Sequence, residues 1–175
     1  MREAGTVLET ERLTLREFRP EDVDALSKVL SDPETMKYYP EALDQAGVQE
    51  WIDRNCRRYE NDGHGLWAMI LKSSGELVGD CGLALQEVDA EKLIEIGYHV
   101  RRDLWGEGLA PEAARACRDF GFSKLGAERL ISLIRPENQP SRRVAEKTGL
   151  TIWKQTRWRN ILHLVYAVSA PLPVA

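Results

Sequence analysis

The chain has 175 residues, of which 43% are hydrophobic, so it can bury one good core and has little room for a second. Its formal net charge is only −4, and basic residues are mixed with acidic ones along the whole length, which argues against a surface that coats nucleic acid. No apolar run approaches the roughly 20 residues that span a bilayer, and the N-terminus lacks the apolar region of a signal peptide. We therefore expect one cytoplasmic domain, residues 1–175, without a nucleic-acid or membrane partner.

The cysteines and histidines show no pattern of a metal site. Cys56, Cys81 and Cys117 lie far apart and form no CxxC pair, and the three histidines are scattered as well. Free cysteines are often buried in protein cores. We therefore expect reduced core cysteines and no bound metal.

The first half of the chain predicts a strand, two helices and a hairpin. Residues 12–18 alternate in polarity, as a strand does. Apolar positions then recur at helical spacing from Pro20 to Asp32, and again from Val48 to Tyr59. Two apolar runs joined by a polar turn follow at residues 66–71 and 77–85, a pattern typical of an antiparallel hairpin.

The second half predicts further strands and helices. After an acidic loop we expect a strand at residues 93–100, a helix at 110–122, a strand at 129–134, a helix at 138–147 and strands near 150–156 and 163–168. Residues 169–175 contain two prolines and are expected to form a loose tail, outside a core of about residues 8–168. The order of elements predicts a mixed α+β domain built on one central sheet.

Residues 101–122 are the most informative stretch, because a turn with two glycines lies between a predicted strand and a predicted helix. Gly106 and Gly108 lack a Cβ, so the backbone can approach a ligand closely, and the first N–H groups of the following helix attract anions. The spacing matches neither the dinucleotide-binding fingerprint nor a P-loop. The turn is therefore either an ordinary tight connection or a cradle in which backbone amides hold a pyrophosphate.

Three segments, in this order, resemble the GNAT superfamily of acetyl-coenzyme A dependent N-acetyltransferases. They are WGEGLA at residues 105–110, NQPS at 138–141 and EKTGL at 146–150. The opening segment, the EIGYHV strand and NQPSRRVAEKTGL further resemble the RimJ/RimL branch, which acetylates N-terminal amines of ribosomal proteins. The resemblance runs from about Leu8 to Val168 and implies a single-domain fold with a twisted mixed sheet of about seven strands, flanked by about four helices.

The resemblance also implies that two neighbouring parallel strands, residues 93–100 and 129–134, separate and admit the pantetheine arm of acetyl-coenzyme A. The implied cofactor-binding residues are Tyr98, His99 and Val100 on the first strand, Trp105, Gly106, Glu107, Gly108, Leu109 and Ala110 in the turn, and Asn138, Arg142 and Arg143 beyond the second strand. Tyr98 packs either on the pantetheine arm or in the core. Trp105 stands where many relatives have Gln or Arg, so the backbone N–H groups of the turn are the expected pyrophosphate donors. Arg142 and Arg143 either bind the 3′-phosphate of the coenzyme or form a solvated helix face.

Two side chains are candidates for acid–base chemistry. Glu95 interrupts an apolar strand, where partial burial would raise its pKa and suit it to accept the proton of an amine; otherwise it points outward or pairs with an arginine. His99, on the same strand face, is an alternative base or water anchor, and His163 is a weaker one. Many relatives carry a tyrosine at the position of Ala145 as the acid that protonates the thiolate. We therefore nominate Ser141 as the acid, with helix capping as its alternative role.

The predicted activity is direct transfer of an acetyl group from acetyl-coenzyme A to a primary amine, such as a protein N-terminus. The alternative acceptor is a small molecule, such as an amino acid, a polyamine or an antibiotic; a different alternative is a non-catalytic acyl-coenzyme A binding module. Residues 36–41, the surroundings of Trp67 and residues 153–161 are candidates for the amine site. The chain is expected to be a monomer or a homodimer.

Overall fold

Eight strands form one sheet in the computed structural model, which describes residues 5–174. The strands are β1 (Thr6–Glu9), β2 (Leu13–Arg16), β3 (Leu66–Leu71), β4 (Leu77–Val88), β5 (Glu91–Val100), β6 (Arg129–Ile134), β7 (Thr151–Trp158) and β8 (Ile161–Ser169). Their order in the sheet is β1-β2-β3-β4-β5-β6-β8-β7, and the parallel pair is β5 with β6. The predicted mixed α+β fold is confirmed, and β1 is a strand that the sequence analysis did not predict.

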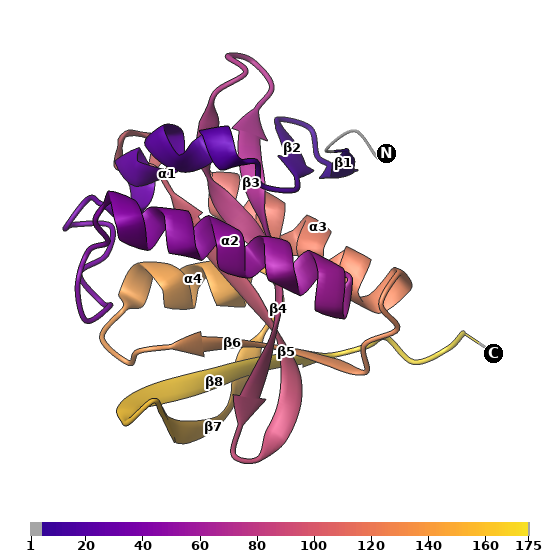
Figure 1. The fold of residues 1–175 in the computed structure, drawn as a ribbon. Coiled ribbons are helices and arrows are strands. Elements are labelled where there is room, and N and C mark those ends of the chain that lie inside the picture. The colour runs from indigo at the N-terminus through magenta and orange to yellow at the C-terminus, as the bar shows by residue number, and fades with distance from the viewer. Residues whose placement is uncertain (1–4, 175) are drawn as a thin grey trace.

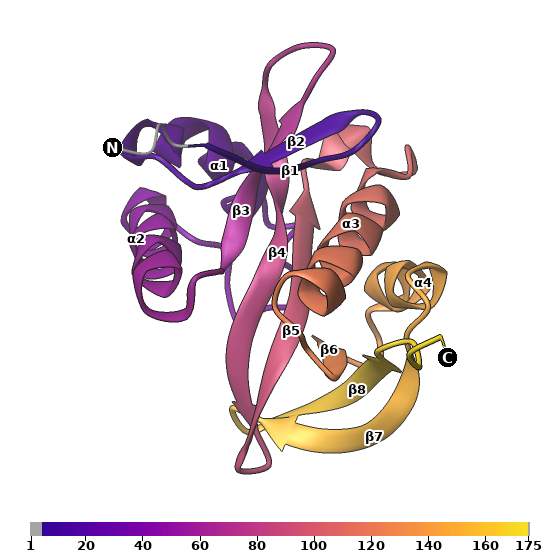
Figure 2. The same cartoon turned by 90° about the vertical axis from the view of Figure 1, so that its right-hand side faces the viewer.

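Four helices cover both faces of this sheet (Figure 1). They are α1 (Val23–Leu30), α2 (Gln45–Asp62), α3 (Leu109–Ser123) and α4 (Gln139–Lys147). Figure 2 shows α1 and α2 on one face and α3 and α4 on the other. All four were predicted from the sequence, with boundaries that differ by a few residues. Within the described residues, no helix is both long and apolar enough to cross a membrane.

Successive side chains of β3 point to opposite faces of the sheet, so this strand contributes to the core on both faces. Ala68 packs with residues of α1 and α2, such as Leu26 and Ile52. Trp67 packs on the opposite face with small residues of α3, such as Ala113. Small side chains on α3 let that helix lie close to the sheet, so the turn that precedes α3 is held at a fixed place.

The cysteines follow their predicted state only in part. All three are free, and Cys81 and Cys117 are fully buried, with their Sγ atoms 3.6 Å apart. Cys56 of α2 is only half-buried. Burial raises the pKa of the Cys81 thiol, which keeps it protonated in the core.

Two hairpin turns are tighter than the sequence analysis predicted. Asp89 and Ala90, with φ values of 51° and 65°, join β4 directly to β5, where an acidic loop was expected. Arg159 and Asn160, with φ values of 49° and 63°, join β7 to β8 in the same way. Two-residue turns of this kind match the twist of the flanking strands, so both pairs of strands continue farther than expected.

The parallel strands β5 and β6 pair over a short stretch only. The paired residues are Ile94 with Leu130 and Glu95 with Ile131. β5 continues to Val100 and β6 to Ile134 with no further pair between these described segments, so the two strands separate. The sequence resemblance had implied this separation. It leaves backbone N–H and C=O groups available for a ligand.

Candidate active site

The turn after β5 has the backbone geometry of an anion site. Gly106 and Gly108 have φ values of +81° and +80°, in the left-handed region that favours glycine. A Cβ on Gly106 would meet no atom within 4 Å, so the space beside the turn is open. Since α3 begins at Leu109, its first N–H groups have no partner within the helix and lie next to the turn. The turn therefore fits the pyrophosphate of coenzyme A.

Side chains from other parts of the chain hold this turn. Trp105, which is 46% exposed, donates from Nε1 to the carbonyl of Val100 at 2.8 Å and so fixes the turn to the end of β5. Arg12 donates to the carbonyl of Glu107 at 2.8 Å and forms an ion pair with Glu112 of α3. Trp105 thus has a positioning contact within the protein, and Arg12 is a second support that the sequence analysis missed.

A cavity of about 280 Å³ lies where β5 and β6 separate. Its walls come from the α1–α2 connection, α2, β4, β5, β6, the start of α4 and the β7–β8 hairpin. The predicted site residues that line it are Glu95, Tyr98, His99, Asn138 and Ser141, and the weaker candidate base His163 lines it as well. The fold therefore brings the proposed base and the proposed acid to one cavity.

The Glu95 carboxylate lies at the point of strand separation. Its Oε2 accepts a hydrogen bond from the N–H of Leu133 at 3.0 Å, and its Oε1 accepts one from Gln86 Nε2 at 3.1 Å. Burial raises the pKa of Glu95, and the two hydrogen bonds and the positive charge of Arg58 offset only part of this rise. Glu95 faces the cavity and forms no ion pair with any residue described, so its surroundings suit a proton acceptor.

A hydrogen-bonded chain runs from the cavity to a fully buried carboxylate. The Tyr39 hydroxyl lies 2.6 Å from His99 Nε2, and His99 Nδ1 lies 2.7 Å from Asp80 Oδ1. Trp51 donates to the other oxygen of Asp80 at 2.9 Å. Because the carboxylate accepts, Nδ1 carries a hydrogen, and in the neutral ring Nε2 can accept from the Tyr39 hydroxyl. Although 41% of Tyr39 is exposed, desolvation of its hydroxyl beside buried His99, together with the negative charges of Glu95 and Asp80, raises the pKa of Tyr39, so the hydroxyl stays neutral.

This arrangement changes the expectation for His99. The resemblance implied a cofactor-binding residue, whereas both ring nitrogens of His99 are engaged by Asp80 and Tyr39. The side chain therefore has no nitrogen left for the coenzyme, and it orients the Tyr39 hydroxyl instead.

Asn138 and Ser141 have separate roles at the start of α4. Asn138 is the residue that caps the helix, since its Oδ1 accepts from the N–H of Ser141 at 3.2 Å. The alternative that the Ser141 side chain caps the helix is wrong. Ser141 lines the cavity, and its hydroxyl has no hydrogen-bond partner in the described part of the chain. The Tyr98 hydroxyl donates to the carbonyl of Ser141 at 2.8 Å, which links β5 to α4.

The two arginines of α4 differ in their contacts. Arg142 donates from Nε to the Tyr166 hydroxyl at 3.0 Å and from Nη1 to the carbonyl of Pro136 at 2.9 Å. These bonds use two of its five donors to hold α4 against β8, so its contact with the 3′-phosphate stays a prediction. Arg143 is exposed and has no ion-pair partner among the residues described, so it remains the candidate for the 3′-phosphate.

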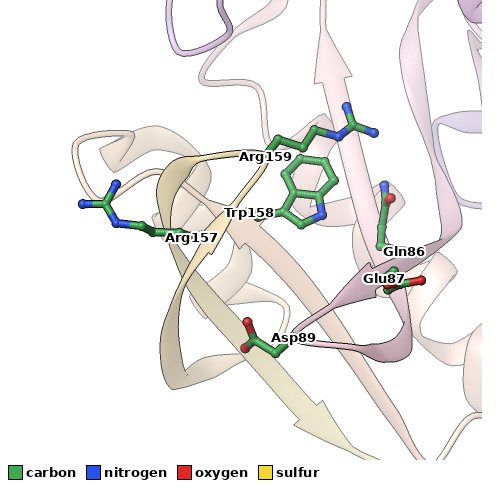
Figure 3. A pocket seen from close by; sticks show the side chains of 6 residues that line it. All are labelled: Gln86, Glu87, Asp89, Arg157, Trp158 and Arg159. Carbon is green, nitrogen blue, oxygen red and sulfur yellow. The ribbon is translucent and has the colours of Figure 1, made fainter.

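The cavity continues into an open groove of about 390 Å³ between the tips of two hairpins. Figure 3 shows its lining, which consists of Gln86, Glu87, Asp89, Arg157, Trp158 and Arg159. Gln86, Trp158 and Arg159 line both spaces, and the guanidinium of Arg159 lies 4.2 Å from the centre of the Trp158 ring. Of the predicted amine-site segments, 36–41 and 153–161 contribute to the cavity wall, and so does Leu66 beside Trp67, whereas Trp67 itself is core, with 1% exposed.

Most of the residues missed by the sequence analysis act through partners far away in the chain. Arg12 and Gln86 gave no signal, because nothing local shows what they contact, and Tyr39 was predicted only as part of the amine-site segment 36–41. Asp80 did give one, since it interrupts the apolar run of β4 just as Glu95 interrupts β5. An aspartate that is 0% exposed needs hydrogen-bond partners, and the same argument would have found it.

Comparison with known proteins identifies the family. Residues 12–151 match the family described as acetyltransferase (GNAT) domain. The uncharacterized protein YkkB of Bacillus subtilis is 39% identical over 164 residues, which are 93% of this chain and 95% of that protein. The uncharacterized N-acetyltransferase p20 of Bacillus licheniformis is 37% identical and covers 77% of this chain and 76% of its own. The FsC-acetyl coenzyme A-N(2)-transacetylase of Aspergillus fumigatus is 32% identical over 85% of this chain and 66% of its own.

Solved structures agree with this fold. An acetyltransferase from Agrobacterium tumefaciens superposes with a TM-score of 0.82 at 29% identity and covers 96% of both chains. An aminoglycoside acetyltransferase in complex with coenzyme A gives 0.75 at 17% identity, covering 90% of this chain and 94% of its own. A ribosomal-protein alanine acetyltransferase from Vibrio fischeri gives 0.71 at 13% identity, covering 93% and 95%. The last two likenesses show the fold alone. The chain therefore belongs to the GNAT acetyltransferase family, so its acetyl donor is acetyl-coenzyme A.

Proposed function

We propose that this protein acetylates a primary amine by direct transfer, with Glu95 as the base and a peptide N-terminus as the acceptor, as in the RimJ/RimL branch. The observation that carries the proposal is the Glu95 carboxylate, which has a raised pKa and faces the cavity at the point where β5 and β6 separate. Acetyl-coenzyme A supplies the acetyl group, already activated as a thioester.

Glu95 and Tyr39 prepare the amine. An amine attacks only as the free base, so an ammonium must lose a proton near neutral pH. Glu95 accepts this proton, and its two hydrogen bonds hold the carboxylate in one orientation while leaving other lone pairs free. The Tyr39 hydroxyl directs its hydrogen to His99, so its oxygen can accept a hydrogen bond from the amine and position it.

Other groups act on the donor side. The unpaired part of β5 offers backbone N–H groups that polarise the thioester carbonyl. Ser141, which lines the same cavity, passes a proton to the departing thiolate and regains one from the attacking nitrogen, which must lose a proton to form the amide. The turn from Trp105 to Ala110 holds the pyrophosphate, and Arg143 binds the 3′-phosphate.

The groove supports a peptide acceptor. It continues the cavity past Trp158 and Arg159 and is open to solvent, which leaves room for the residues that follow an N-terminal amine. A small metabolite would need only the inner cavity.

Calorimetric titration with acetyl-coenzyme A, followed by thiol release with peptides and small amines, tests the proposal. We expect binding, and release that depends on peptide amines. Binding with release for small amines only would change the acceptor. Binding without release for any amine would leave the non-catalytic alternative, and no binding would contradict the role of the turn.

A further inference from the structure

We infer that the acceptor carries an anionic group, a carboxylate or a phosphate, near its amine, and that Arg58 binds this group together with Arg54 and Arg159. The inference deepens the proposed function and rests on it for the position of the amine at Glu95. It names the chemical class of the acceptor.

The three arginines meet at one cavity from two elements. Arg54 and Arg58 are four residues apart on α2, so they share one face of the helix. Arg159 belongs to the β7–β8 turn, and all three line the cavity that contains Glu95. Arg57, the neighbour of Arg58, is exposed, does not line the cavity and pairs with Glu50.

No carboxylate neutralises these three side chains. Within the described residues none of them forms an ion pair, whereas Arg135, the fourth arginine of the lining, pairs with Glu137. Burial and the charges of Arg54 and Arg159 lower the pKa of Arg58, although Glu95 and Asp62 act in the opposite sense. Arg54 and Arg58 are half-buried and Arg159 is exposed, and like charges held together with partial burial are unfavourable unless an anion joins them.

Neighbouring side chains orient the three arginines and leave donors free for a ligand. Arg54 lies 5.4 Å from the centre of the Trp51 ring, and Arg159 stacks on Trp158 in the same manner at 4.2 Å. Stacking leaves the edge of a guanidinium, which carries its donors, free for a planar anion. Arg58 donates from Nη1 to the Oδ1 of buried Asn55 at 3.3 Å, which orients its guanidinium and leaves other donors unused.

The cluster is on the acceptor side of the sheet. Figure 2 shows α2 on the face opposite α3, whose N-terminus follows the pyrophosphate turn, so the phosphates of the coenzyme have a separate place. Farther out, the groove contains Glu87 and Asp89, and Asp89 pairs with Lys154 at 2.8 Å. The groove also contains Arg157 and Arg159, so charges of both signs are mixed there. In the inner cavity the three arginines outnumber the Glu95 carboxylate, so polyamines or aminoglycosides would be repelled there.

Matched acceptors that differ only in charge test the inference. We would measure kcat/KM for two peptide amides with Glu or Gln after the N-terminal residue, and for serine against serinamide. The wild type is expected to prefer the acidic member by about tenfold or more, as for hydrogen bonds to charged groups. The pair that shows the preference identifies the source of the anion. Arg58→Gln should bring that ratio close to one, Arg58→Lys should restore part of it, and Arg57→Gln should leave it unchanged.

Binding of the acetylated forms of the same compounds to the coenzyme A complex separates this inference from the proposed function. Tighter binding of the acidic member, lost in Arg58→Gln, supports the anion site even if no amine is turned over. Equal binding and equal kcat/KM within each pair would overturn the inference while leaving the acetyltransferase activity intact. Unchanged affinity of every variant for acetyl-coenzyme A is the check on folding.

Discussion

The part of the site that binds the acetyl donor and the part that binds the amine acceptor use different chemical groups: backbone N–H groups in the first and side chains in the second. On the donor side, two glycines and the first turn of α3 present backbone N–H groups within one short segment of the chain. On the acceptor side, Glu95, Tyr39 and Arg58 come from β5, the α1–α2 connection and α2, and each is held by a partner elsewhere. Backbone recognition suits a constant phosphate group, whereas side chains can change with the acceptor. Donor binding should therefore be lost when a side chain fills the turn, whereas acceptor binding and catalysis should be lost when single functional groups are removed.

Filling the turn should have the largest effect. Gly108→Arg places a side chain where φ is +80° and where a Cβ lies 3.5 Å from Arg12, so it should abolish binding of acetyl-coenzyme A. Gly75→Arg is the matched control, because Gly75 has a φ of +74°, no atom within 4 Å of its Cβ position and a place in the β3–β4 hairpin. Both variants carry backbone strain of about 1–3 kcal/mol, which thermal unfolding can compare. Calorimetry that shows equal loss of binding in both would mean that strain alone, and not the filled cradle, is responsible.

Replacing Glu95, the proposed base, should have the second largest effect. Glu95→Gln is expected to lower kcat by about 10²–10⁴-fold, the usual share of general base catalysis, with little change in acetyl-coenzyme A affinity. Glu91→Gln, an exposed residue of the same strand, is the control.

The pH profile adds a second readout for Glu95. Burial raises its pKa, so wild-type kcat/KM should fall on the acid side as this carboxylate protonates, with a midpoint above the ordinary value of about 4.3. Glu95→Gln should lack this acid limb. A variant that keeps the limb and the rate would leave the base role to another group.

Removing Tyr39 from the hydrogen-bonded chain that it forms with His99 and Asp80 should have a smaller effect. Tyr39→Phe removes the hydroxyl that bonds to His99, and since Tyr39 is 41% exposed, the fold should be nearly unaffected. We expect kcat/KM to fall about tenfold, the value of one hydrogen bond of about 1.4 kcal/mol. The loss should fall on KM for the amine if Tyr39 only binds it, and on kcat if it aligns the amine for attack. Equal kinetics would show that this hydroxyl does not contact the acceptor.

The two sides also differ in how far the sequence predicts them. The turn was predictable because glycine at positive φ and a following helix start are local properties of residues 106–110. The separation of β5 and β6 came from family resemblance, and no periodicity in either strand indicates it. Glu95 was found because a carboxylate inside an apolar run is unusual, yet its contact with Leu133 depends on the sheet order. The arginines of α2 look like any solvated helix face until the β7–β8 turn is placed opposite them.

The smallest expected effect separates two roles, acid and helix cap, that the sequence analysis had given as alternatives for Ser141. A thiol with a pKa near 8.5 leaves readily, so Ser141→Ala should slow kcat only about fivefold, with no change in stability or coenzyme binding. Asn138→Ala removes the cap of α4 and should lower the free energy of unfolding by about 1 kcal/mol. Denaturant unfolding and steady-state kinetics of both variants separate these roles. A Ser141→Ala protein at full rate would mean that the thiolate departs without help from this hydroxyl, and the open cavity would then leave that proton to solvent.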